Sequence, residues 1–285
     1  MNQTNRILTR SVLSLLLIGL VGVWLLTAAC TQRAVEDLED IPTLADINAM
    51  QTALPLTQNA PPAPYNLPVT AFGRVDNRLN ELAGWHYVVT FEFNGVFSST
   101  PREVNASARA EVWFNQLASA RRILLATSGT LFGETGGVNY EAVRLGRDAF
   151  LVQNNACLAN LAGETGDAQA AADLGAGALV GGINRAVPAG RQATINGEQV
   201  YGYAFDPAEL VLPSISLEGG GTQTVSSSEL WIAPAANAVI RFYVNLDVEN
   251  VTLLDSQLPV SGQVILRYDL YEVGNAFNIS EPFGC

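Results

Sequence analysis

The stretch GWHYVVTFEFNGVF, residues 84–97, alternates apolar and polar side chains along most of its length. Its apolar set shares one face: Trp85, Tyr87, Val89, Phe91, Phe93 and Phe97. Its polar set shares the other: His86, Thr90, Glu92 and Asn94. Alternation with a period of two predicts a strand that has one buried face and one face toward water.

The same period returns repeatedly after this stretch. It occurs in residues 104–114, 121–127, 139–153 with a turn at 145–148, 192–205 with a turn at Asn196-Gly197, 228–232, 239–248 and 263–272. Asn-Gly is a turn that hairpins favour, and each stretch has one apolar and one polar face. We therefore expect nine or ten strands in an antiparallel sheet that is wet on one side and covered on the other.

Two stretches with helical spacing are expected to cover part of the apolar side. The first is residues 72–82, and the second is the Ala- and Gly-rich run 167–185. Gly175, Gly177, Gly181 and Gly182 weaken the second by about 1 kcal/mol each. The second run is either a lid over an apolar concavity or an ordinary surface loop with one helical turn.

The first thirty residues predict an export signal and an anchor. Residues 1–29 carry Arg6 and Arg10, then an apolar run and small residues, as a secretory signal peptide does. The segment LTAAC, residues 26–30, resembles the bacterial lipobox, in which Cys30 becomes diacylated. The alternative is an uncleaved membrane anchor with an incidental Cys. Both place the remainder outside the cytoplasm, tied to a membrane, with the acidic, Pro-rich residues 30–68 as a tether.

Composition excludes several classes of function. The chain has 285 residues, 27 acidic residues and 15 basic ones, all of them Arg, for a net charge of −12. A chain this acidic is a poor binder of nucleic acid. One His and three Cys argue against a zinc site, and no metal or other cofactor is expected. His86 lies on a polar strand face, which does not indicate a Ser-His-Asp triad.

Two cysteines remain once Cys30 is assigned to the lipid. In an oxidising compartment Cys157 and Cys285 are expected to form a disulfide, and two unpaired thiols are the alternative.

Four local motifs, taken in order, carry a family resemblance. They are LGRDAFL at 145–151, INGEQVYGY at 195–203, ELWI at 229–232 followed by VIRF at 239–242, and LYEVGNAFNISEP at 270–282. Over about residues 70–283 the chain resembles the LolA/LolB-like superfamily, and especially bacterial lipoproteins of the LppX/LprG type. It departs from them in its long Gly/Ala insert, residues 158–191, and in having no Lys.

The resemblance implies a mostly β (α+β) domain over residues 69–285, a single curved antiparallel sheet or half-barrel with helices covering its concave face. It also implies a monomer that is not an enzyme and that binds or carries lipid acyl chains against that face. The residues that would line the cavity are Trp85, Tyr87, Val89, Phe91, Phe93, Phe114, Tyr203, Phe242 and Leu266. The alternatives are a filled core in an envelope scaffold or sensor that acts through protein–protein contact, and a hydrolase.

Overall fold

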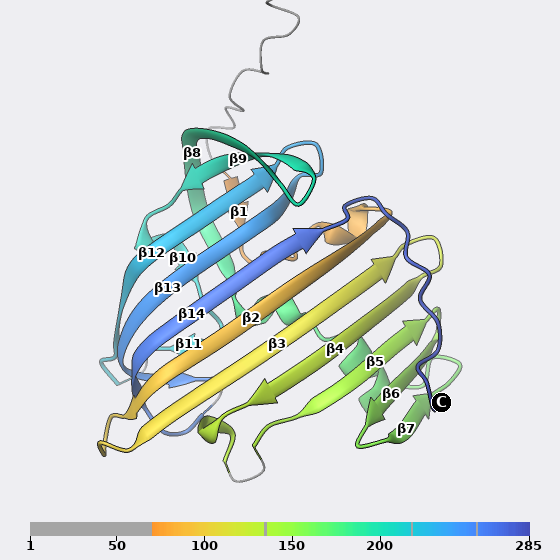
Figure 1. Ribbon diagram of the computed structural model, residues 1–285, viewed down its shortest axis with the longest axis horizontal. Coiled ribbons are helices and arrows are strands. Elements are labelled where there is room, and N and C mark those ends of the chain that lie inside the picture. Colours follow the sequence, from red (N-terminus) through yellow and green to blue (C-terminus); the bar gives the residue numbers. More distant parts are fainter. Residues whose placement is uncertain (1–69, 134–135, 218, 255) are drawn as a thin grey trace, which may run out of the picture. The chain divides into compact units, whose positions relative to one another are not determined.

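The computed structural model describes residues 70–133, 136–217, 219–254 and 256–285. In this part of the chain the alternating stretches form one antiparallel sheet of 14 strands (Figure 1). The order across the sheet is β1-β8-β9-β12-β13-β14-β2-β3-β4-β5-β6-β7, while β10 pairs with β8 and β11 with β13. The prediction of one large antiparallel sheet is confirmed.

The strands are β1 (Thr70–Phe72), β2 (Gly84–Phe97), β3 (Glu103–Asn115), β4 (Ala120–Ser128), β5 (Asn139–Leu145), β6 (Asp148–Gln153), β7 (Ala156–Asn160), β8 (Gly182–Ile195), β9 (Glu198–Ala204), β10 (Leu210–Val211), β11 (Ile215–Ser216), β12 (Thr222–Ala233), β13 (Ala238–Leu253) and β14 (Val260–Tyr271). The helical segments are the 3₁₀ helices η1 (Leu79–Glu81), η2 (Thr130–Phe132), η3 (Ala176–Leu179) and η4 (Pro207–Glu209), and the helix α3 (Asp167–Ala172). The count of nine or ten strands was too low, because β1, β7, β10 and β11 are too short to show an alternation.

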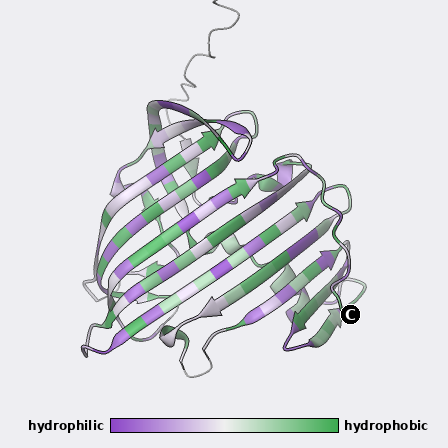
Figure 2. Cartoon of the chain, in the orientation of Figure 1, coloured by the Kyte–Doolittle hydropathy of each residue, from purple (hydrophilic) through white to green (hydrophobic). Residues whose placement is uncertain are grey.

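The pairing of β14 with β2 joins the two halves of the sheet. These strands are paired without a break from Val260↔Phe97 to Tyr271↔His86. One half contains β2–β7 and the other contains β8, β9 and β12–β14. Figure 2 shows apolar and polar residues alternating along these strands. We call the face that carries Phe91 and Leu266 the inner face, and the opposite face the outer face.

The prediction of a helix over residues 72–82 is wrong. Residue Phe72 ends β1, and only Leu79–Glu81 forms a helical turn. Arg78 precedes that turn in the left-handed conformation, with φ 72°, which interrupts a helix. The apolar residues of this stretch are nevertheless buried in the core as expected, namely Phe72, Val75 and Leu79.

The second expected helix, over residues 167–185, is also wrong in its length. Residues 167–172 form α3 and residues 176–179 form η3, whereas β8 begins at Gly182. The four glycines between residues 175 and 182 account for this break, because each opposes a continuous helix. The long helices predicted over the concave face are therefore replaced by short elements, which lie behind the strands in Figure 1.

The run of residues 166–181, which we name the covering segment, lies on the inner face. Its helix α3 packs against β4–β7, and η3 packs against β2. Ala172, Ala176 and Val180 of this segment belong to the same buried cluster as the inner-face residues of the sheet. Small side chains let the covering segment lie close to the sheet.

Candidate functional site

The nine residues predicted to line a cavity all lie in the core of the inner face. None is more than 9% exposed, and Tyr87, Val89, Phe91, Phe93, Phe242 and Leu266 are completely buried. Trp85 stacks on Tyr87 and on Phe114, with ring centroids 5.1 and 5.2 Å apart. The structure thus brings the predicted residues together in one packed layer.

A polar pocket opens beside three of these nine residues. It has a volume of about 220 Å³. Its lining consists of Arg74, Asp76, Asn80, Trp85, Tyr87, Phe114, Arg121, Arg144, Asp173 and Gly175. We name it the arginine pocket. It lies between the sheet, the turn that follows β1 and the covering segment, so its walls come from three separate parts of the chain.

Two arginines of this pocket are direct neighbours on the inner face. Arg121 of β4 is the cross-strand partner of Arg144 of β5, and Arg121 is also opposite Phe114 of β3. Both residues therefore occupy positions that elsewhere on this face are apolar. Like charges placed directly opposite each other destabilise a sheet. A pair of cations at core-facing positions therefore needs hydrogen-bond acceptors or carboxylates from other parts of the chain.

The hydrogen-bond acceptors of Arg121 belong to the main chain of the covering segment. The residue is only 8% exposed, and its guanidinium donates hydrogen bonds to the carbonyl oxygens of Ala172 and Leu174. The bond from Nη2 to the Leu174 oxygen is 2.6 Å long. The Ala172 carbonyl belongs to the last residue of α3, where helix carbonyls lack partners within the helix, and Leu174 follows two residues later. Arg121 thus fastens the covering segment to the sheet.

Two carboxylates add to this attachment. Arg144 Nη1 lies 2.9 Å from Asp173 Oδ1, next to the end of α3. Asp76, in the turn after β1, forms an ion pair with Arg74 and accepts a 3.2 Å hydrogen bond from the main-chain nitrogen of Gly177. Charged groups from the sheet and from the turn therefore hold both α3 and η3.

Tyr87 connects this polar group with the packed aromatic layer. Burial raises the pKa of the Tyr87 phenol, and the Asp76 carboxylate raises it further, while Arg121 opposes the shift. The hydroxyl therefore stays protonated and donates a hydrogen bond of 3.3 Å to Asp76 Oδ2. Beside it, with ring centroids 5.5 Å apart, lies the fully buried Tyr268. In the described part of the chain the Tyr268 hydroxyl has no hydrogen-bond partner.

Gly177 allows the covering segment to approach Asp76. A Cβ atom at this position would lie 2.4 Å from the Asp76 carboxyl carbon. We expect Gly177→Ala to loosen the covering segment, because overpacking of this kind costs about 1–3 kcal/mol. Amide exchange of residues 176–181 should accelerate about fivefold or more in hydrogen-exchange mass spectrometry. Gly73→Ala is the matched control, since nothing lies within 4 Å of its added Cβ. Equal exchange rates in the two variants would contradict this prediction.

The two remaining cysteines are joined. Cys157 of β7 and Cys285 form a disulfide with a Cα–Cα distance of 5.4 Å. The C-terminal segment, residues 272–285, reaches β7 after contacting the ends of β2 and β3. Gly274 N donates to Gly84 O over 2.8 Å, and Asn115 Nδ2 donates to Phe277 O over 2.7 Å. Cys30 lies outside the described residues, as do all the residues of the predicted signal peptide and tether.

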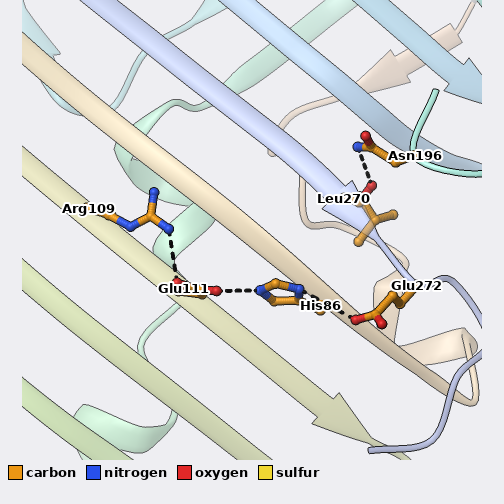
Figure 3. A network of polar contacts seen from close by, with 6 residues as sticks. All are labelled: His86, Arg109, Glu111, Asn196, Leu270 and Glu272. Carbon is orange, nitrogen blue, oxygen red and sulfur yellow. Dashed lines mark hydrogen bonds and ion pairs between the residues drawn. The ribbon is translucent and has the colours of Figure 1, made fainter.

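His86 lies on the outer face, as expected, but it is not open to solvent. Its side chain is 15% exposed, and the ring stacks on Trp113 with centroids 4.7 Å apart. Its Nε2 lies 2.9 Å from Glu111 Oε1, and its Nδ1 lies 3.7 Å from Glu272 Oε2 (Figure 3). Since Glu272 begins the C-terminal segment, this cluster helps to fix that segment on the sheet.

Two further properties bear on the kind of site. Among residues 70–285, apart from the few that are not described, no group of three or more His, Cys, Asp or Glu side chains is arranged to hold a metal ion. No helix in the described part of the chain is both long enough and apolar enough to cross a membrane.

The arginine pocket was not found from the sequence, although a signal for it exists. In the run ARRILLATS of β4, Arg121 shares its register with the core residue Ile123. In β5, Arg144 shares its register with the buried Ala142. A charged residue at a core-facing position of a strand is the anomaly that marks this site.

No family model matches the chain, and no curated protein matches it. Among solved structures it is similar to LprF from Mycobacterium bovis, with 17% identity over 73% of this chain and 93% of that one, at a TM-score of 0.36. It is also similar to a LolA superfamily protein from Nitrosomonas europaea, with 11% identity over 72% of this chain and 93% of that one, at a TM-score of 0.22.

Proposed function

We propose that this protein is an extracytoplasmic lipoprotein that binds or carries a hydrophobic ligand, the acyl chains of a lipid, between the inner face and the covering segment. One observation carries the proposal. A part of the large apolar sheet face, over β2 and β4–β7, is covered by a short segment rich in Ala and Gly, and that segment is attached through polar contacts of Arg121, Arg144 and Asp76. Such a cover can separate from the sheet without unfolding the sheet itself.

The proposed binding step exchanges one set of apolar contacts for another. When the covering segment moves away, the aromatic layer that includes Trp85, Tyr87 and Phe114 becomes accessible. Acyl chains then take over the contacts that Ala172, Ala176 and Val180 make in this structure. Burial of each CH₂ group contributes about 0.8 kcal/mol, so chains of ordinary length supply enough free energy to hold the cover open. No covalent chemistry is involved, and the protein is not an enzyme.

The proposal includes the anchoring predicted from the sequence. Residues 1–29 direct export, Cys30 carries the lipid, and residues 30–68 connect it to the domain of residues 69–285. Two acyl chains suffice for stable attachment to a membrane. A tether of this length spans roughly 35 Å as a flexible chain, so the domain can stand clear of the lipid headgroups.

The burial of all nine predicted cavity residues, none of which is more than 9% exposed, favours one alternative function. A sheet whose inner face is a filled core needs no ligand for its stability. Such a protein would act as an envelope scaffold or sensor through contacts with other proteins. The covering segment would then be a permanent part of the core, and its polar attachment would serve stability alone.

Native and denaturing mass spectra of the full chain, purified in detergent from bacterial membranes, distinguish the two functions. After incubation with a lipid extract, carriage predicts a native mass that exceeds the denatured mass by one lipid. An unchanged native mass would favour the scaffold. The denaturing spectrum also tests the anchor, because a diacylated chain that begins at Cys30 has a mass different from that of the uncleaved chain.

A further inference from the structure

The positive charge of the arginine pocket exceeds its negative charge. Three arginines and two aspartates line it. Each aspartate is already paired, Asp76 with Arg74 and Asp173 with Arg144. In the described part of the chain no carboxylate lies within ion-pair distance of Arg121. One cation of this site therefore has no carboxylate partner.

The acceptors that Arg121 does have are neutral. Both are main-chain carbonyl oxygens of the covering segment. Beside it, Arg144 Nε is buried and has no hydrogen-bond acceptor among the described residues. A buried donor without an acceptor is unfavourable, and hydrogen bonds between two charged groups are stronger than those to a neutral carbonyl. The guanidinium of Arg121 and the unpartnered Nε of Arg144 are thus available to an anion that offers charged acceptors.

The size and surroundings of the pocket restrict what that anion belongs to. A volume of about 220 Å³ is smaller than the roughly 300–1,000 Å³ of sites that enclose a whole drug-sized ligand. The pocket has room for a headgroup and not for acyl chains. Its aromatic wall, Trp85, Tyr87 and Phe114, is continuous with the packed layer of the inner face. A molecule that fits both regions is an amphiphile with an anionic headgroup.

We propose that the arginine pocket binds the phosphate group of an anionic lipid and that this binding releases the covering segment. This inference rests on the proposed function. The phosphate oxygens accept hydrogen bonds from Arg121 and Arg144, a geometry that suits the planar guanidinium fork. They thereby displace the carbonyls of Ala172 and Leu174. The cover loses its attachment to β4, and the acyl chains of the same lipid enter beneath it.

Titration of the full-length protein in detergent with three probes tests this inference. The probes are a short-chain phosphatidic acid, the diacylglycerol with the same chains, and inorganic phosphate. We expect phosphatidic acid to bind about tenfold or more tighter than diacylglycerol, because only the former offers charge-assisted hydrogen bonds. Arg121→Gln should abolish this preference. Because the substitution also removes the attachment of the covering segment to β4, the affinity for diacylglycerol should not fall.

Arg122→Gln is the matched control, since Arg122 is the next residue of β4 but lies on the outer face, 2.9 Å from Glu141. It should retain the preference for phosphatidic acid. Arg144→Gln provides a second test if Arg121→Gln does not fold, as judged by circular dichroism. Equal binding of both lipids by the wild-type protein would overturn the inference and leave the proposed function intact. Binding of neither lipid would overturn the proposed function itself, and phosphate bound as tightly as phosphatidic acid would overturn the assignment to a lipid.

Discussion

Replacing Cys157 and Cys285 together with serine is expected to lower the free energy of unfolding by about 4–5 kcal/mol on the chain-entropy model. The bond joins residues 128 positions apart, so its removal frees a very large loop in the unfolded chain. A loss of this size is a large part of the stability of an ordinary domain, which is about 5–15 kcal/mol. Urea denaturation of the oxidised protein and of the double variant measures it.

Loss of the disulfide should also loosen the C-terminal segment. Without the disulfide, its attachment depends on a few contacts, among them the bond from Gly274 to Gly84 and the bond from Asn115 to Phe277. Limited proteolysis should therefore cut residues 276–285 faster in the double variant. The wild-type protein treated with a reductant is the control and should behave like the variant. A stability loss below about 1 kcal/mol would show that residues 157 and 285 remain close in the unfolded chain.

Replacing Phe91 with alanine is expected to cost about 3–5 kcal/mol if the inner face is a filled core. Phe91 is completely buried in the middle of β2, between Ala108 of β3 and Leu266 of β14. Removing its ring leaves a cavity that these neighbours fill only in part. Denaturant titration of the variant measures the loss.

The magnitude of this loss also bears on the proposed function. Thr90→Ala is the control, because Thr90 is the adjacent residue on the outer face, and it should change stability by no more than about 0.5 kcal/mol. A cost near that of the control for Phe91→Ala would mean that the inner face is loosely packed. If lipid restores the stability of Phe91→Ala more than that of the wild-type protein, the inner face is the binding surface.

The sequence predicted the long strands well because their pattern is set locally. The alternation in residues 84–97 matches β2 over its whole length, and the turn at 145–148 lies between β5 and β6. The helices were predicted poorly, since apolar spacing at 72–82 indicated a buried face while Arg78 interrupts the helix. For residues 72–82 the predicted burial was therefore correct, although the predicted secondary structure was wrong.

Only the apolar residues of the candidate site could be predicted from the sequence. Trp85, Tyr87 and Phe114 follow directly from strand alternation. The arginine pocket depends on the register that sets Arg121 opposite Arg144, and on where residues 166–181 return to the sheet. Both are contacts between distant parts of the chain, and no single stretch of sequence contains them. A residue with the wrong polarity for its strand face was the one local sign.

The pairing of β14 with β2 has a consequence for the order of events during synthesis. Chains are made from the N-terminus, so β2 waits for one of its two neighbours until everything from β3 to β13 has been made. During that interval β2 presents an unpaired strand edge and uncovered aromatic side chains, both of which favour aggregation. Contacts between segments so far apart also slow folding. The nascent chain is thus most vulnerable along the strand that becomes the centre of the finished sheet, and it is there that a chaperone would have to act.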